Sequence, residues 1–419
     1  MRKWPLGAAA LAAAGLGLPW VLGAQAERFY ADALSRLPEQ GLRVVDSRYE
    51  RGWFGSRAST GLAVMTDLAE VPDGPSERMR VSSEIGHGPL RLDAPRLLSA
   101  AVIRSRVELA DVETEAPLLL LETVLNLDGG GEIQLRLPAI GSAAGDQPGL
   151  ETVEGTGSAR FSPGFSSFEG RFELPSLSLS DQEGSLRLRG LSGESSASRL
   201  VGSVFAGTAS LRLDELALRL PGAVLDAGGI SVRVDSEPQG RLLNARAAYR
   251  VERLTVQGAD YGPSLAEFSL SRVSSDDLAA LQQALRQVSA QPLAGSLAGL
   301  AMAAVLAEHL PRLLATDPAV GRDRLEVTTP DGRVEGRLLL SARGLNADVM
   351  RRPGAWLAQV VGEGDISLPE SLLLRLLEER YRSQALETNR RGGAGEQALT
   401  AEAEREVVRS ARDQLAAGL

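Results

Sequence analysis

The stretch FELPSLSLSDQEGSLRLRGL, residues 172–191, decides the fold class of this chain. Apolar and polar residues alternate on both sides of Gln182-Glu183-Gly184, which is the pattern of strands that bury one face and expose the other. A short polar segment with glycine between two such runs is typical of a hairpin turn. The stretch therefore predicts an antiparallel hairpin with one apolar side.

The same alternation continues beyond this hairpin, and no helical segment interrupts residues 42–272. Its further apolar positions include Leu211, Leu213, Leu216, Leu218, Leu220, Ile230, Val232, Val234, Val251, Leu254 and Val256. Turn-forming text separates the runs at Asp128-Gly129-Gly130-Gly131, Ser162-Pro163-Gly164, Pro221-Gly222, Gly228-Gly229 and Pro238-Gln239-Gly240. A long array of one-sided strands must roll up, pair with a second sheet or be covered by helices.

Helical patterns begin after residue 272 and predict a helical insert over residues 273–320. Ser274-Ser275-Asp276-Asp277 is typical of a helix start, and Pro311 is expected to kink or end the second helix of the insert. The chain is thus predicted to be α+β and predominantly antiparallel β, with a long curled sheet.

Residues 321–369 are predicted to complete the β domain. Two strands, 325–329 and 333–342, flank the turn Pro330-Asp331-Gly332. A helix near residues 355–361 and a short strand over 364–369 follow, and residues 370–419 are predicted to form C-terminal helices.

The N-terminus predicts a membrane segment. Trp4 to Ala24 carries no charge and follows Arg2 and Lys3, and its length suits a bilayer-crossing helix, which needs about 20 apolar residues. Ala24-Gln25-Ala26 also fits a signal-peptidase site, so residues 1–26 are either an uncleaved signal-anchor, which length favours, or a cleaved signal peptide. Residues 27–41 predict an amphipathic helix, and the bulk of the chain is expected outside the cytoplasm.

The amino-acid composition argues against several classes of functional site. The chain has no cysteine, which removes disulfides and thiolate sites, and its net charge of −9 argues against nucleic acid as a partner. His87 and His309 are the only histidines, no Gly-x-Ser-x-Gly elbow is present, and the usual histidine spacing of zinc sites is missing. The sequence therefore predicts no catalytic residue, no metal site and no cofactor.

Acidic and glycine-rich motifs are better explained by structure than by catalysis. Walker loops need a lysine, and the only one is Lys3, while Gly155-Thr156-Gly157 lacks the third glycine of a dinucleotide loop. Neighbouring carboxylates such as Asp276 and Asp277, or Glu378 and Glu379, point about 100 degrees apart on a helix and cannot straddle one substrate bond. We expect capping and solvation from them.

One family resemblance stands out. The run from Tyr49 to Ser56, YERGWFGS, together with the preceding apolar segment and His87-Gly88-Pro89, is similar to the YdgA-like family of bacterial envelope proteins. The resemblance spans most of the chain. It implies an inner-membrane anchor through residues 4–24, a bulk that faces the periplasm, and no established activity.

Three functional hypotheses follow. The first is a non-enzymatic module that binds or transfers a lipid or other hydrophobic ligand on the apolar side of the sheet. The second is a scaffold that holds envelope proteins through its sheet edges or helices. The third, and weakest, is a hydrolase that uses His87 with a carboxylate.

Overall fold

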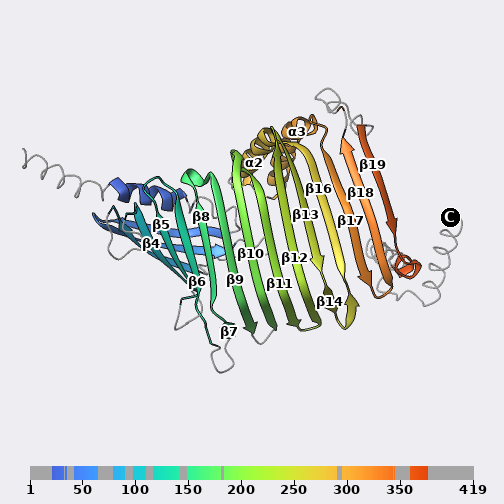
Figure 1. The fold of residues 1–419 in the computed structure, drawn as a ribbon, viewed down its shortest axis with the longest axis horizontal. Coiled ribbons are helices and arrows are strands. Elements are labelled where there is room, and N and C mark those ends of the chain that lie inside the picture. Colours follow the sequence, from blue (N-terminus) through green and yellow to red (C-terminus); the bar gives the residue numbers. More distant parts are fainter. Residues whose placement is uncertain are drawn as a thin grey trace, which may run out of the picture.

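The protein is a single curved antiparallel β-sheet with few helices (Figure 1). The computed structural model describes residues 21–32, 34, 42–64, 79–89, 98–109, 117–141, 149–180, 184–289, 295–342, 344 and 359–375. The described strands belong to one 19-stranded sheet, which is not closed. The predicted predominantly antiparallel β class is confirmed.

The first half of the sheet consists of shorter strands. They are β1 (Leu42–Arg51), β2 (Gly55–Val64), β3 (Met79–His87), β4 (Ala101–Leu109), β5 (Leu119–Leu125), β6 (Gly131–Leu137), β7 (Gly149–Thr152), β8 (Gly155–Phe161) and β9 (Ser167–Ser180). A 3-10 turn, η2 (Pro163–Phe165), joins the last two. The expected hairpin at Arg51-Gly52 is present, because β1 and β2 pair antiparallel and the Gly52 N–H donates to the Gly55 carbonyl over 2.9 Å.

The second half holds the longest strands and the helical insert. Its strands are β10 (Ser185–Val201), β11 (Val204–Leu220), β12 (Ala223–Gln239), β13 (Leu242–Val251), β14 (Arg253–Val256), β15 (Ala259–Tyr261), β16 (Ser264–Ser274), β17 (Ala319–Thr329), β18 (Gly332–Ala342) and β19 (Val360–Ser367). The helices α2 (Ser275–Ser289) and α3 (Gly295–Leu314) lie between β16 and β17.

Strands adjacent in sequence are mostly adjacent in space. The exceptions are β7, which pairs with β9 while β6 pairs with β8, and the short strands β14 and β15, which let β13 pair directly with β16. Because directly paired residues lie on the same face of the sheet, each face can be followed from one strand to the next through the pairing register.

The long central strands share an interruption of their alternation. Apolar residues are three positions apart instead of two at Leu174/Leu177, Leu188/Leu191, Leu213/Leu216 and Ala227/Ile230. The pairing register places these interruptions in one row. Gly190 and Gly229 in this row have φ angles of 66° and 62°, in the left-handed region that favours glycine. The alternation of side chains between the two faces therefore shifts by one residue at the same place in β9, β10, β11 and β12. As a result, the leucines before and after this row lie on the same face of the sheet.

The best-packed core lies where the helical residues 21–32 cross the N-terminal strands. Its fully or nearly buried members are Leu22, Ala26, Ala58, Ile85, Ala100, Ala101, Ile103, Leu125 and Phe161. Phe29 stacks on Phe161 with ring centroids 5.7 Å apart, and Phe161 stacks on Phe165 at 4.6 Å. The Arg51 guanidinium pairs with the Glu27 carboxylate at 2.9 Å, which ties the helix to the β1–β2 hairpin.

The predicted membrane segment, residues 4–24, lies outside the described residues except for 21–24. No described helix is long and apolar enough to cross a membrane. Of the predicted amphipathic helix 27–41, residues 27–32 are helical, and Phe29 and Tyr30 pack against the sheet as the pattern requires. Leu37, Pro38 and Gly41 lie outside the described residues.

The helical insert follows its sequence signals closely. The Asp277 N–H donates to the Ser274 hydroxyl over 3.2 Å, so Ser274 caps α2. Helix α3 continues past Pro311 and ends at Leu314, although the proline lacks the N–H of one intrahelical hydrogen bond. Val204 and Ala206 of β11 and Leu243 of β13 form a second, smaller core with Leu278 and Ala279 of α2.

Two predicted boundaries near the C-terminus are wrong: the helix predicted to end at residue 361 and the strand predicted to begin at residue 364, because β19 begins at Val360. Residues 360–361, predicted as the end of a helix, begin β19, where Val360 pairs with Ala342 and Val361 with Ser341. Valine is β-branched and favours an extended chain when a partner strand is present, so pairing overrides the local pattern. Of the predicted C-terminal helices 370–419, only residues 370–375 are described, and they are helical.

Candidate functional site

One face of the sheet is apolar from β9 to β19, the last of the described strands. A single row of register-paired residues illustrates it: Phe172, Gly193, Leu211, Val232, Tyr249, Ala266, Leu325, Gly336 and Ile366. A second row, beyond the shift in alternation, is Leu150, Leu179, Leu186, Leu218, Leu225 and Val256. We call this surface the apolar face.

The apolar face is open in the described part of the chain. Leu211 is 40% exposed, Tyr249 44% and Ile366 65%. Helix α2 packs against the ends of β10, β11, β13 and β16, partly through Leu278 and Ala279, whereas α3 packs mainly against α2. An exposed apolar surface of several strands is unusual for a soluble monomer, which makes the apolar face a candidate binding surface.

A hollow of about 390 Å³ lies on the apolar face over β6, β8, β9, β10 and β11. Ile133, Leu135, Ala159, Phe172 and Ala209 contribute apolar walls. At Gly193 an added Cβ would lie 2.5 Å from the Phe172 ring, so glycine lets this ring lie flat on the neighbouring strand. The hollow is therefore shallow and lined mainly by carbon, which suits an aliphatic chain better than a polar substrate.

His87 lies at the end of β3 and is buried beneath the N-terminal helix. Its Nε2 is 2.9 Å from the Ser56 hydroxyl, and its Nδ1 is 3.2 Å from the Trp53 carbonyl oxygen. A carbonyl only accepts, so Nδ1 carries the proton and Nε2 accepts from Ser56. An added Cβ at Gly23 would lie 2.5 Å from the imidazole Cε1, which shows how closely the helix covers the ring.

These contacts account for His87 by packing and hydrogen bonding inside the protein. Its backbone partner, the Trp53 carbonyl, lies 34 positions away in the β1–β2 hairpin. Ser56 and His87 are 6% and 5% exposed, and Gly23 of the helix lies against the imidazole ring. The hydrolase hypothesis stays a prediction, which substitution of His87 by alanine tests.

Further hydroxyl groups lie near the same helix as Ser56 and His87. The Tyr30 and Thr60 hydroxyls are 2.9 Å apart, and Ser47 joins Thr60 at 3.1 Å. Burial raises the pKa of the Tyr49 hydroxyl above its ordinary value of 10.0. The nearby Ser56 hydroxyl offsets this pKa shift in part, although the two oxygens do not meet the geometry of a hydrogen bond.

The other residues considered for chemistry lie apart from one another. His309 is on α3, and its Nδ1 has no hydrogen-bond partner in the described structure. Asp276 and Asp277 are in the first turn of α2, where they oppose the helix dipole. Glu378 and Glu379 lie outside the described residues. Gly155 and Gly157 are strand residues of β8, and Asp128 accepts from the Gly130 N–H at 2.9 Å in the expected turn.

The described residues contain no group of three or more His, Cys, Asp or Glu side chains that could hold a metal ion. What sequence reasoning missed is the shift in alternation, whose signal was the three-residue spacing between leucines. It also missed the hollow that arginine and glutamate side chains line on the polar side of the N-terminal strands, because solvent-facing charges look alike in sequence whether or not they line a hollow.

The fold and its faces define a class: an open, single-sheet antiparallel β protein whose described residues form a packed core at one end and an uncovered apolar face along the other. The chain belongs to the DUF945 family, described as bacterial proteins of unknown function, and the family model matches residues 1–419. No curated protein and no solved structure gives a significant match.

Proposed function

We propose that this protein binds the acyl chains of a lipid on its apolar face and shelters them from water in the bacterial cell envelope. The observation that carries the proposal is the apolar row from Phe172 to Ile366, in which the side chains of Phe172, Leu211, Tyr249 and Ile366 are each more than one third exposed. Covering such a surface with aliphatic chains gains about 25 cal/mol for each square ångström removed from water.

Two features favour an acyl chain as the occupant. The apolar face is continuous across neighbouring strands spaced about 4.8 Å apart, so it offers a long path instead of a compact cavity. Its hollow near Phe172 has mainly carbon walls and no described cluster of convergent polar groups. A polar substrate would need such groups for orientation.

Strand β11 supplies a matched pair of variants. Leu211 lies on the apolar face between Gly193 and Val232, whereas its neighbour Ser210 lies on the opposite face between Glu194 and Arg233. Leu211→Glu places a charge where the acyl chain would lie, and Ser210→Glu places the same charge on the polar side. Both substitutions are at exposed positions of one strand, so their effects on folding are expected to be small.

The experiment measures lipid that co-purifies with the full chain, extracted and quantified by mass spectrometry. We expect lipid with the wild type and with Ser210→Glu, and a clear loss with Leu211→Glu. Circular dichroism must show the same strand content in all three proteins. Equal lipid in the two variants, or none in the wild type, would refute the proposal.

We also propose an envelope location, anchored in the inner membrane through residues 4–24 with the bulk in the periplasm. The uncharged stretch after Arg2 and Lys3 and the resemblance to YdgA-like proteins support it. Protease added to spheroplasts is expected to degrade the chain, and membrane fractionation should retain it. Recovery from the cytosol would contradict this placement, and recovery from soluble periplasm would indicate cleavage after Ala26.

A scaffold remains a second candidate, because both ends of the sheet are edges. β1 pairs only with β2, and β19 only with β18, among the described strands. An edge strand can accept an added strand from a partner. A photo-reactive residue at Glu363 on β19 should then cross-link to one extended segment of an envelope protein, whereas the same residue at Arg212 inside the sheet should not. Equal cross-linking from both positions would argue against strand addition.

A further inference from the structure

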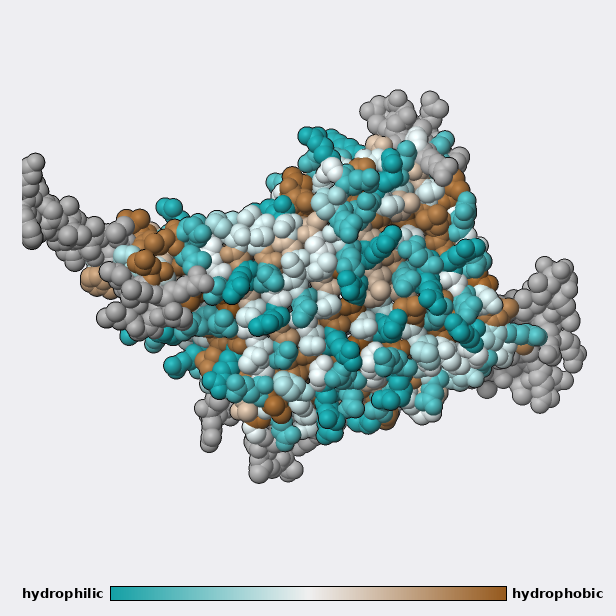
Figure 2. Space-filling model, in the orientation of Figure 1, coloured by the Kyte–Doolittle hydropathy of each residue, from teal (hydrophilic) through white to brown (hydrophobic). Residues whose placement is uncertain are grey.

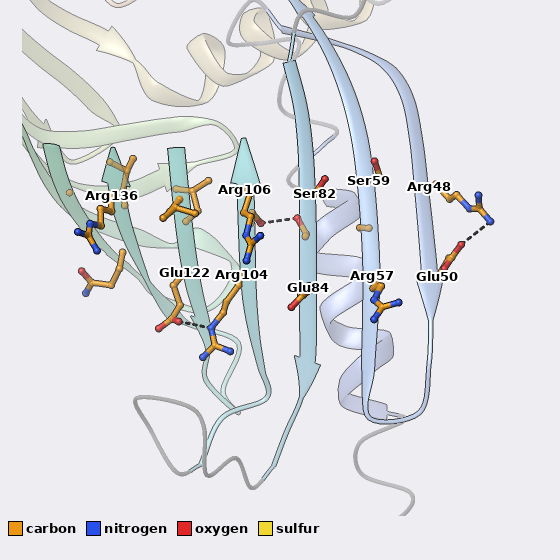
Figure 3. A pocket seen from close by; sticks show the side chains of 18 of the residues that line it. Arg48, Glu50, Arg57, Ser59, Ser82, Glu84, Arg104, Arg106, Glu122 and Arg136 are labelled. Atoms are coloured by element: carbon orange, nitrogen blue, oxygen red, sulfur yellow. Dashed lines mark hydrogen bonds and ion pairs between the residues drawn. The ribbon is translucent and has the colours of Figure 1, made fainter. Parts of the chain in front are cut away.

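The largest hollow over the N-terminal strands lies on the face opposite the N-terminal helix (Figure 3). It has a volume of about 860 Å³ and extends over β1 to β6 and β8. Its lining includes five arginines and three glutamates, a surplus of two positive charges in a chain whose net charge is −9. We call it the polar groove.

Two register rows cross the floor of the polar groove. The first alternates in charge, one residue per strand from β1 to β6: Glu50, Arg57, Glu84, Arg104, Glu122 and Gln134. The second is rich in donors: Arg48, Ser59, Ser82, Arg106, Leu120 and Arg136. Hydrophilic side chains likewise cover most of the molecular surface that Figure 2 turns to the viewer.

The outer arginines of the groove are already paired. Arg48 pairs with Glu50 at 2.8 Å, Arg104 with Glu122 at 2.8 Å, and Arg136 with Glu154 at 2.8 Å. These exposed pairs contribute little stability. They leave Arg57, Arg106 and Glu84 as the charged side chains of the groove without an ion pair in the described structure, which together carry one net positive charge.

Four donors at the centre of the groove have no polar partner within the described structure: Arg57, Ser59, Ser82 and Arg106. Ser59 pairs in register with Ser82, and Ser82 with Arg106, so three of them are on consecutive strands. Figure 3 shows Arg106 beside Ser82 and Arg57 on the strand that carries Ser59. The backbones of Arg57 and Arg106 are two strands and two residues apart, roughly 12 Å, so both guanidinium groups can reach toward the serine pair.

We infer that the polar groove binds a phosphate group through Arg57, Ser59, Ser82 and Arg106. Guanidinium groups and hydroxyls are donors that match phosphate oxygens, and a tetrahedral anion has enough oxygens to engage donors on both sides of it. A planar carboxylate has only two. The inference concerns the face opposite the acyl-chain surface and does not depend on the proposed function.

Glu84 is the acidic residue at the centre, and it forms no ion pair in the described structure. It lies in register between Arg57 and Arg104 and therefore weakens anion binding by repulsion. Its removal is expected to tighten binding, which is a result that a loss of folding cannot imitate.

Calorimetric titration of the full chain with inorganic phosphate, at low ionic strength, tests the site. Arg57→Gln and Arg106→Gln are each expected to weaken binding about tenfold, since a hydrogen bond to a charged group contributes about 1.5 kcal/mol or more. Arg136→Gln removes one arginine from the same groove but from an existing pair, and should change affinity little. Glu84→Gln should bind phosphate more tightly than the wild type.

A second measurement distinguishes free phosphate from a lipid headgroup. Full chain and Arg106→Gln are sedimented with phosphatidylcholine vesicles and with vesicles that also contain phosphatidic acid. A phosphatidic acid response that needs Arg106 identifies the headgroup as the source, and calorimetric binding without that response identifies a soluble phosphate. Absence of both responses, or equal loss with Arg57→Gln, Arg106→Gln and Arg136→Gln, would overturn the inference.

Discussion

The same face of the sheet is covered by a helix over its N-terminal strands and is open over its later strands in the described structure. Over β2 to β8 the helical residues 21–32 pack on it, with Ala26 fully buried and Ala58, Ile85 and Phe161 buried beneath the helix. Over β9 to β18 it carries Phe172, Leu211 and Tyr249, and no described helix lies across its middle. The comparison teaches that the same one-sided strand pattern forms a buried core where a helix packs on it and an exposed apolar surface where no described helix does.

The largest expected effect contrasts two truncations on this face. Ile85→Ala in the covered region, where Ile85 is 2% exposed, should lower the free energy of unfolding by about 2–5 kcal/mol. Leu338→Ala in the open region, where Leu338 is 42% exposed, should cost about 1 kcal/mol or less. Chemical denaturation of both variants measures the difference. Similar losses would mean that the open region is covered in solution.

A smaller effect tests how the helix docks. Gly23→Ala places a methyl group against the His87 ring and should destabilise the protein by about 1–3 kcal/mol. In a His87→Ala background the ring is absent, so the same change should cost about 0.5 kcal/mol or less. Thermal or denaturant unfolding of the four proteins gives the coupling free energy. Additive effects would show that Gly23 and His87 are not in contact.

The smallest effect is a pH dependence of the covered region. Burial raises the pKa of Tyr49 above its ordinary value of 10.0, so on raising the pH the unfolded chain loses this proton before the folded one does. Through Tyr49, the free energy of unfolding should therefore stay constant below pH 10.0 and fall as the pH rises from there through the folded-state pKa. Tyr49→Phe removes the titrating group and should show a weaker decline. Identical profiles would exclude Tyr49 as a contributor.

Much of the fold could be predicted because it depends on local periodicity. Alternation of apolar and polar residues indicated strands, Pro330-Asp331-Gly332 indicated the β17–β18 turn, and Ser274 indicated the cap of α2. The helix predicted near residues 355–361 was wrong at Val360 and Val361, because pairing with β18 is a tertiary interaction that local pattern does not contain.

The candidate sites could be predicted from the sequence only in part. The leucine ladder suggested an apolar side, which the register rows from Leu150 to Val256 confirm. The polar groove could not be predicted, since Arg57, Ser82 and Arg106 are far apart in sequence and only strand pairing brings them together. His87 was noticed as a histidine, but its contact with Ser56 depends on the pairing of β2 with β3.

The sequence by itself determined that the chain forms antiparallel strands with one apolar side, because side chains alternate with a period of two wherever the backbone is extended. Tertiary structure alone decided which strands are neighbours, that the alternation shifts in one row across β9 to β12, and which part of the apolar face the helix covers. The physical reason is that register and docking are set by contacts between residues distant in sequence, and these contacts leave no local periodic signal.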